Sequence, residues 1–71
     1  MKVLKFDTIE DFNAANDLIH LTLKDRDDYQ AQKYASPYQL EDGSWFIEIL
    51  PIFESQLINL AKTNNWTIAE I

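Results

Sequence analysis

The sequence between residues 34 and 50 limits the possible folds more than any other part of the chain. It contains two apolar and aromatic runs separated by Asp42-Gly43, and Gly43 is the only glycine among the 71 residues. Asp-Gly between two such runs is a strong signal for a β-hairpin, because a type I′ turn needs a positive φ at both central residues. The sequence therefore predicts two adjacent antiparallel strands joined by a two-residue turn.

A two-residue turn fixes which residues oppose each other across the predicted hairpin. Tyr38 then pairs with Ile47 on one face, and Gln39 pairs with Phe46 on the other face. The first face is the more apolar of the two, and we expect it to belong to the core. Pro37 has no N–H to donate, so we expect the first strand of the hairpin to lie at a sheet edge.

Two stretches carry apolar residues at helical spacing, and each is expected to bury one face. The first is predicted to run from residue 9 to residue 23 or 24. Both Thr8-x-x-Asp11 and Asp7-x-x-Glu10 fit a capping box, so either Asp7 or Thr8 can begin this helix. The second is predicted for residues 52–63. It is expected to end at Asn64-Asn65, because asparagine tolerates the left-handed conformation that closes many helices.

Two further strands are predicted at residues 2–6 and 66–71, so the order of elements is β-α-β-β-α-β. In a chain of 71 residues this order predicts an α+β fold of the ferredoxin-like split βαβ type. Both helices would cover one face of a four-stranded sheet with the first and third strands at its centre. No internal repeat or linker divides residues 1–71, so we expect a single domain.

The composition excludes several functions. Twelve acidic residues against six basic ones give a formal net charge of −6, which argues against direct nucleic-acid binding through clustered Lys and Arg. The absence of cysteine excludes disulfides, and a single histidine excludes a multi-histidine metal site. No segment reads as a signal peptide or a membrane helix, so we expect a cytoplasmic protein with no membrane contact.

Two candidate reactive sites have simpler interpretations. Asp25, Asp27 and Asp28 could bind a divalent cation weakly, but the run lacks the glycine and glutamate of a calcium loop and fits a solvated helix end. His20 has Asp17 as a helical neighbour but no nucleophile nearby in the sequence. We therefore predict no cofactor, no metal and no enzymatic activity. A hydrolase or transferase that uses His20 is the weakest hypothesis.

The helix-free face of the predicted sheet is the leading candidate for function. Phe46 and Leu50 are expected to project onto it, with Glu48 between them. A carboxylate at this position repels phosphate, so the face suits a protein partner or a second copy of the chain. The predicted contact residues are Phe46, Leu50 and Tyr38, although the hairpin pairing also allows Tyr38 to be a core residue. An alternative is that residues 24–33 partly cover Phe46 and Leu50. The sequence thus predicts a non-catalytic protein-interaction module.

An acidic mimic of nucleic acid is the alternative function. Carboxylates between Glu10 and Asp28 would stand in for phosphates and block a DNA- or RNA-binding protein. Such a complex should weaken as salt is added, because exposed charge pairs are screened.

The chain also resembles a group of known proteins. The segment YQAQKYASP at residues 29–37, the sequence DGSW at residues 42–45 and the helix sequence FDTIEDFNAAN resemble small uncharacterised proteins encoded in phages and prophages. The resemblance covers residues 6–50. It implies an origin in a mobile element and an accessory, non-catalytic role, and it supplies no functional residues.

Overall fold

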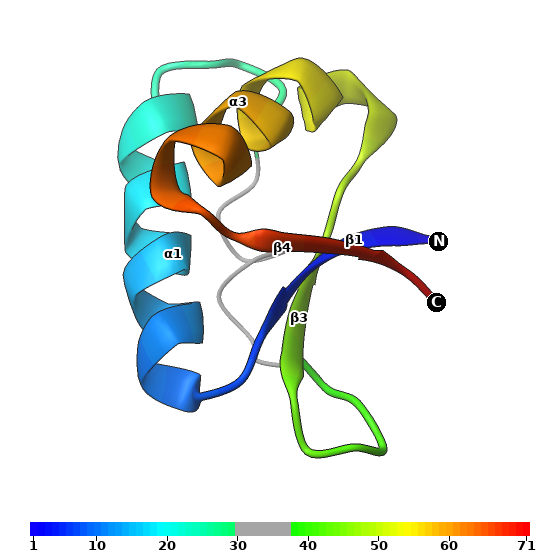
Figure 1. Ribbon diagram of the computed structural model, residues 1–71. Coiled ribbons are helices and arrows are strands. Elements are labelled where there is room, and N and C mark those ends of the chain that lie inside the picture. The colour runs from blue at the N-terminus through cyan, green and yellow to red at the C-terminus, as the bar shows by residue number, and fades with distance from the viewer. Residues whose placement is uncertain (30–37) are drawn as a thin grey trace.

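The computed structural model describes residues 1–29 and 38–71. The elements in chain order are β1 (Lys2–Phe6), α1 (Ile9–Leu23), β2 (Tyr38–Gln39), β3 (Trp45–Glu48), the 3-10 turn η1 (Pro51–Phe53), α3 (Glu54–Asn64) and β4 (Thr67–Glu70). All strand pairs are antiparallel, in the order β2-β3-β1-β4. Figure 1 shows α1 running along one side of the sheet, α3 crossing near its top, and β4 in front.

The first helix forms as predicted, with the bounds Ile9–Leu23. Thr8 has an extended backbone, and its hydroxyl accepts a hydrogen bond from the Asp11 N–H at 3.1 Å. This bond satisfies one of the N–H groups that have no partner inside the first turn of a helix. The buried side chains of α1 recur every three or four residues and are Phe12, Ala15, Ile19 and Leu23.

The second helix begins later than predicted. Pro51–Phe53 form a single 3-10 turn in which the Phe53 N–H donates to the Leu50 carbonyl at 3.0 Å, and the α-helix starts at Glu54. Its predicted end is confirmed, because Asn65 adopts the left-handed conformation with a φ of 59°. The Asn65 N–H donates to the Ala61 carbonyl and so satisfies one of the last carbonyls of the helix.

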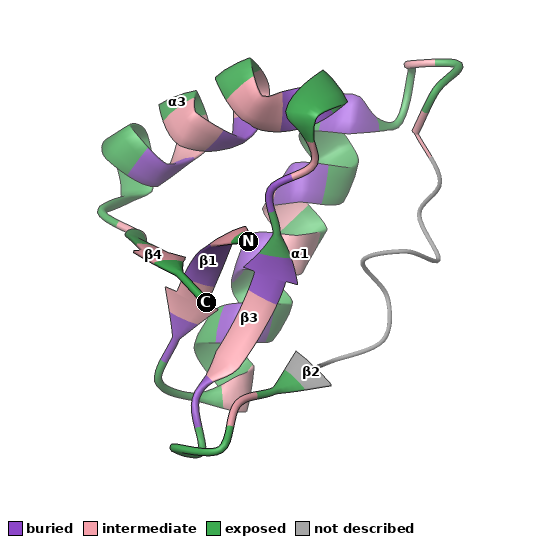
Figure 2. Cartoon of the chain, turned by 90° about the vertical axis from the view of Figure 1, so that its right-hand side faces the viewer, coloured by how far each residue is buried: buried purple, intermediate pink, exposed green. Residues whose placement is uncertain are grey.

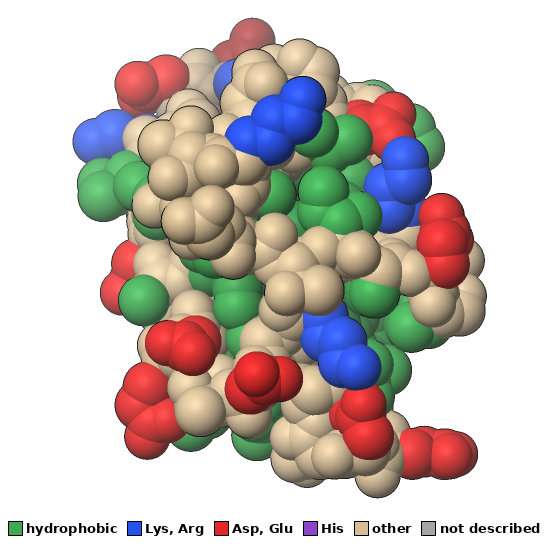
Figure 3. Space-filling model, in the orientation of Figure 1, with side chains coloured by type: hydrophobic (Ala, Val, Ile, Leu, Met, Phe, Trp, Pro, Cys, Tyr) green, Lys and Arg blue, Asp and Glu red, His purple; other side chains and the backbone are tan. Residues whose placement is uncertain are grey.

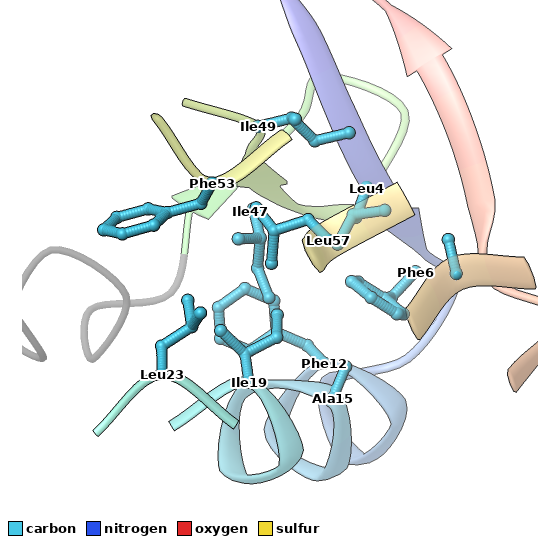
Figure 4. Packing of buried hydrophobic residues seen from close by; sticks show 11 residues of the cluster. Leu4, Phe6, Phe12, Ala15, Ile19, Leu23, Ile47, Ile49, Phe53 and Leu57 are labelled. Atoms are coloured by element: carbon cyan, nitrogen blue, oxygen red, sulfur yellow. The ribbon is translucent and has the colours of Figure 1, made fainter. Parts of the chain in front are cut away.

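The core lies between the two helices and one face of the sheet. A chain of four aromatic rings among the described residues crosses it, with centroid distances of 5.8 Å from Trp66 to Phe6, 6.2 Å from Phe6 to Phe12, and 6.3 Å from Phe12 to Trp45. The first two contacts are edge-to-face, which is a favourable geometry for aromatic pairs. Figure 4 shows side chains from β1, α1 and α3, including Phe6, Phe12 and Leu57, converging in this layer.

The turn of the hairpin is one residue longer than predicted. The Gly43 N–H donates to the Leu40 carbonyl at 3.0 Å, and the Leu40 N–H donates to the Ser44 carbonyl at 2.7 Å. Glu41, Asp42 and Gly43 therefore form a three-residue loop. Gly43 has a φ of 89°, as expected for the left-handed residue that follows a type I turn in such loops.

The longer loop changes the pairing of the two strands. Tyr38 pairs with Phe46, and Gln39 pairs with Trp45. The predicted pairing of Tyr38 with Ile47 is wrong, because one added loop residue shifts the register by one position. The Tyr38 position therefore shares the sheet face of Phe46, whereas Ile47 belongs to the core.

The prediction of a ferredoxin-like sandwich with a four-stranded sheet is wrong. Three antiparallel strands of four or five residues, β3, β1 and β4, make up the sheet, and in the described residues β2 adds only the pairs at Tyr38 and Gln39. The longer loop includes chain that was predicted to belong to the second strand. The predicted start of that strand, at residues 34–37, lies outside the described residues. The α+β class with two helices holds.

The loop geometry predicts how substitutions at Gly43 affect stability. A Cβ added at Gly43 meets no atom within 4 Å, so the cost of a substitution comes from the backbone conformation alone. We expect Gly43→Ala to lower the free energy of unfolding by about 1 kcal/mol, because the left-handed region is unfavourable for most L residues. Gly43→Asn should cost clearly less, since asparagine tolerates this region. Urea unfolding of both variants checks this, and equal losses would contradict the assignment.

Candidate functional site

One face of the sheet carries neither helix, and we call it the helix-free face. It contains alternate residues of the three longer strands, because neighbouring residues of a strand point to opposite faces. Figure 2 looks onto this face, with α1 behind the sheet. The registers of the three strands assign it Val3, Lys5, Phe46, Glu48, Thr67 and Ala69.

Phe46 dominates the apolar surface of the helix-free face. Val3 lies at the centre of this face but is completely buried, whereas Phe46 is half-buried and Glu48 is exposed. The Lys5 ammonium lies 2.9 Å from the Asp42 carboxylate and is therefore occupied by an ion pair. The face thus carries a half-buried aromatic ring bordered by one paired and one exposed charge.

The structure places the three predicted contact residues differently. Phe46 lies on the helix-free face as predicted, and its strand partner on one side is the Tyr38 position. Leu50 lies beyond the end of β3, at the start of η1, and packs against the hydrophobic core. The structure therefore brings Phe46 and the Tyr38 position together and places Leu50 against the core, just before η1.

The hairpin loop is tied to β1 through Asp42. The Asp42 carboxylate accepts hydrogen bonds from the Ser44 N–H, at 2.9 Å, and from the Ser44 hydroxyl, in addition to its contact with Lys5. The Lys5 ammonium and the Ser44 donors favour the charged form and hold the pKa of Asp42 well below its usual range. The same ion pair raises the pKa of Lys5.

His20 lies beside an aromatic residue that the sequence analysis did not connect with it. Its Nδ1 is 3.4 Å from the Tyr29 hydroxyl, and the Tyr29 ring stands edge-to-face to Phe53 at 6.0 Å. Burial raises the pKa of the Tyr29 hydroxyl. The Arg26 guanidinium lies 5.1 Å from the centroid of the Phe53 ring and binds the Asp28 carboxylate through two hydrogen bonds. These contacts anchor the polar segment after α1 on the end of the core.

One residue of each candidate reactive site, His20 and Asp28, therefore takes part in these contacts. Asp28 is engaged with Arg26 rather than grouped with Asp25 and Asp27. Within residues 1–29 and 38–71, no group of three or more His, Cys, Asp and Glu side chains has the spacing to hold a metal ion.

The N-terminal half of α1 carries exposed carboxylates that the sequence analysis assigned to the alternative function. In the described part of the chain, none of them forms an ion pair. Figure 3 shows acidic side chains gathered at the lower left, over this end of α1. The exposed residues concerned are Glu10, Asp11 and Asp17, and Asp7 is exposed just before the helix.

A cleft of 440 Å³ lies between α1 and the segment that joins α3 to β4. Phe6 and Trp66 contribute apolar walls, and Asp7 and Asp11 contribute carboxylates. Lys5 also lines the cleft, but its ammonium is paired with Asp42. The sequence analysis missed this cleft because its lining comes from distant parts of the chain. The one signal in the sequence concerns the sheet edge beside the cleft. The strand predicted at residues 66–71 has neither lysine nor proline to mark a protected sheet edge.

Comparisons with known proteins identify no relative. No protein-family model matches the chain, and neither the curated proteins nor the solved structures searched give a match. The resemblance to phage-encoded proteins therefore stays a prediction. In the ranges that the structure describes, none of the helices has both the length and the apolar character needed to cross a bilayer.

The low pKa of Asp42 predicts a loss of stability in acid. A carboxylate whose pKa is lower in the folded state stabilises the fold above its unfolded pKa of about 3.9, and this contribution is lost as the pH falls through the folded-state pKa. We expect the urea midpoint of the wild type to fall from about pH 4 downward. Asp42→Asn should make this fall shallower, whereas Glu41→Gln is a neighbouring control that keeps the wild-type slope. Equal slopes for all three proteins would contradict the role of Asp42.

Proposed function

We propose that this protein is a non-catalytic module that binds another protein through the helix-free face of its sheet. The observation that carries the proposal is Phe46, a half-buried aromatic side chain on a sheet face that neither helix covers. Aromatic residues are enriched at protein interfaces, where a rigid ring contributes a large contact area. Glu48 and the Lys5–Asp42 pair beside it supply the polar surroundings that such contacts have at their rim.

The charges on this face favour a protein over a nucleic acid. A phosphate backbone requires several unpaired lysine or arginine side chains. On the helix-free face, the lysine at position 5 is held by Asp42, and Glu48 adds a negative charge. With a formal net charge of −6, the chain as a whole also repels phosphate. A protein surface with apolar and basic groups is the better match.

The cellular setting of the proposal comes from the sequence alone. The resemblance of residues 6–50 to phage and prophage proteins supports an accessory role in a mobile element, and a cytoplasmic location is part of the same proposal.

Substitution of Phe46 tests the proposed surface. We expect Phe46→Thr to keep the fold, because threonine suits a strand, and to weaken partner binding about tenfold or more. Leu21→Thr is the matched control, since Leu21 is 61% exposed on the outer side of α1. Far-UV circular dichroism verifies the fold, and partner capture from cell lysate followed by titration of the purified complex measures the affinity. A partner that binds wild type and Phe46→Thr equally would contradict the proposal.

The carboxylates on α1 favour acidic mimicry as a second candidate. In this case a basic protein would bind Glu10, Asp17 and their exposed neighbours in place of a nucleic acid. We expect the affinity to fall by about tenfold or more when salt rises from low to physiological concentration, because exposed charge pairs are screened.

Neutral variants separate this candidate from the first. Glu10→Gln combined with Asp17→Asn should reduce both the affinity and its dependence on salt, while Phe46→Thr leaves them unchanged. A complex that is insensitive to salt would exclude mimicry.

A further inference from the structure

The outer edge of β4 carries backbone groups without a strand partner in the described residues. The Met1 amine donates to the Ile71 carbonyl at 2.8 Å, and the Ile71 N–H donates to the Met1 carbonyl at 2.9 Å. Hydrogen-bonded and non-hydrogen-bonded pairs alternate along an antiparallel ladder. Ile68 and Glu70 lie at the non-hydrogen-bonded positions opposite β1, so their N–H and carbonyl groups point away from the sheet.

The side chains along this edge leave it open. Sheet edges are commonly protected by charged side chains, proline or a bulge, and the one charged side chain of β4, Glu70, is paired with the Met1 amine at 3.4 Å. Within Thr67–Glu70 there is neither lysine nor proline. Instead, exposed apolar side chains flank the edge: Met1 is 50% exposed, Ile68 41% and Ile71 50%. The edge therefore combines unpaired backbone groups with apolar surface, which are the two features that an added strand uses.

The 440 Å³ cleft lies at the start of this strand, on the side of the helices. A strand placed along β4 sends alternate side chains to that side, where Trp66 and Ile68 lie. The side chain nearest to Trp66 reaches the cleft, where Asp7 and Asp11 form no ion pair in residues 1–29 and 38–71. The carboxylates select a lysine or arginine at that position.

We propose that β4 takes up an extended segment of a partner protein, with a lysine or arginine at the position nearest to the cleft, as an additional strand of the sheet. This inference rests on the proposed function in one respect, namely that the chain is a protein-binding module. It assigns a second surface, the β4 edge, and the chemistry of its occupant. A second copy is the poorer occupant, because each copy carries a formal charge of −6 and brings its own Glu70 to the shared edge.

A peptide titration tests the proposal on the whole chain. The probe is a blocked peptide of alternating lysine and threonine, and its control has glutamate in place of every lysine. The measurement is the exchange rate and the chemical shift of each backbone amide by NMR. We expect the lysine peptide to slow exchange of the Ile68 and Glu70 amides by about tenfold, because these amides gain acceptors. The glutamate peptide should have no effect.

Two pairs of variants locate the contact. Ile68→Pro removes an outward N–H without removing a hydrogen bond to β1, so it should fold and bind the lysine peptide about tenfold more weakly. Ile68→Thr, which keeps the N–H, is its control. Asp7→Asn combined with Asp11→Asn should weaken binding of the lysine peptide to a similar extent, because the lysine ammonium loses two carboxylates as partners. Asp25→Asn combined with Asp27→Asn, away from the cleft, should not.

Three results would overturn the inference. The first is the absence of any change at Ile68 and Glu70 with the lysine peptide. The second is equal binding by Ile68→Pro and Ile68→Thr. The third is protection of these amides that appears without peptide and grows with protein concentration, which would assign the edge to a second copy. Loss of partner binding in Phe46→Thr is a separate readout. The proposals for the helix-free face and for the β4 edge are therefore tested independently of each other.

Discussion

The edge-to-face contacts of Phe6 with Phe12 and Trp66 hold the layers of this protein together. Phe6 ends the strand between β3 and β4, Phe12 is one turn into α1, and Trp66 precedes β4. The three rings thus connect the sheet, the first helix and the last strand at one point. Burial of each large apolar side chain contributes roughly 1.5–3 kcal/mol to the free energy of unfolding. The three rings therefore supply a large part of the stability of so small a domain.

The placement of cations explains why so much negative charge remains on the surface. Lys2 binds Glu54 at the start of α3, Lys5 binds Asp42 in the hairpin loop, and Arg26 binds Asp28 after α1. Exposed pairs of this kind add little stability. In these pairs, however, the cations at the junctions between elements are already bound to carboxylates. Among residues 1–29 and 38–71, the exposed carboxylates of α1 and of the cleft form no ion pair, so the negative charge is concentrated near the N-terminal end of α1.

Local signals predicted the local structure well. Thr8, one of the two capping residues that the sequence allowed, begins α1, and Asn65 adopts the left-handed conformation that the sequence suggested for the end of α3. The hairpin was recognised, but its register was not, because Asp42-Gly43 fits both a two-residue and a three-residue loop. The Leu40–Ser44 hydrogen bond and the pairing of Gln39 with Trp45 establish the three-residue loop. The placement of Leu50 and the existence of the cleft depend on packing between distant segments, which periodicity does not report.

The position of β1 between β3 and β4 has a consequence for how the chain folds. Both neighbours of β1 begin much later in the sequence, at Trp45 and Thr67, so β1 can complete its pairing only after both segments have been synthesised. During synthesis, α1 can form from local contacts, whereas the apolar face of β1 stays unpaired until the later strands have been synthesised. Long-range pairing of this kind slows folding relative to a helical bundle of equal length. The central strand is therefore the apolar segment that stays without its strand partners for longest in the nascent chain.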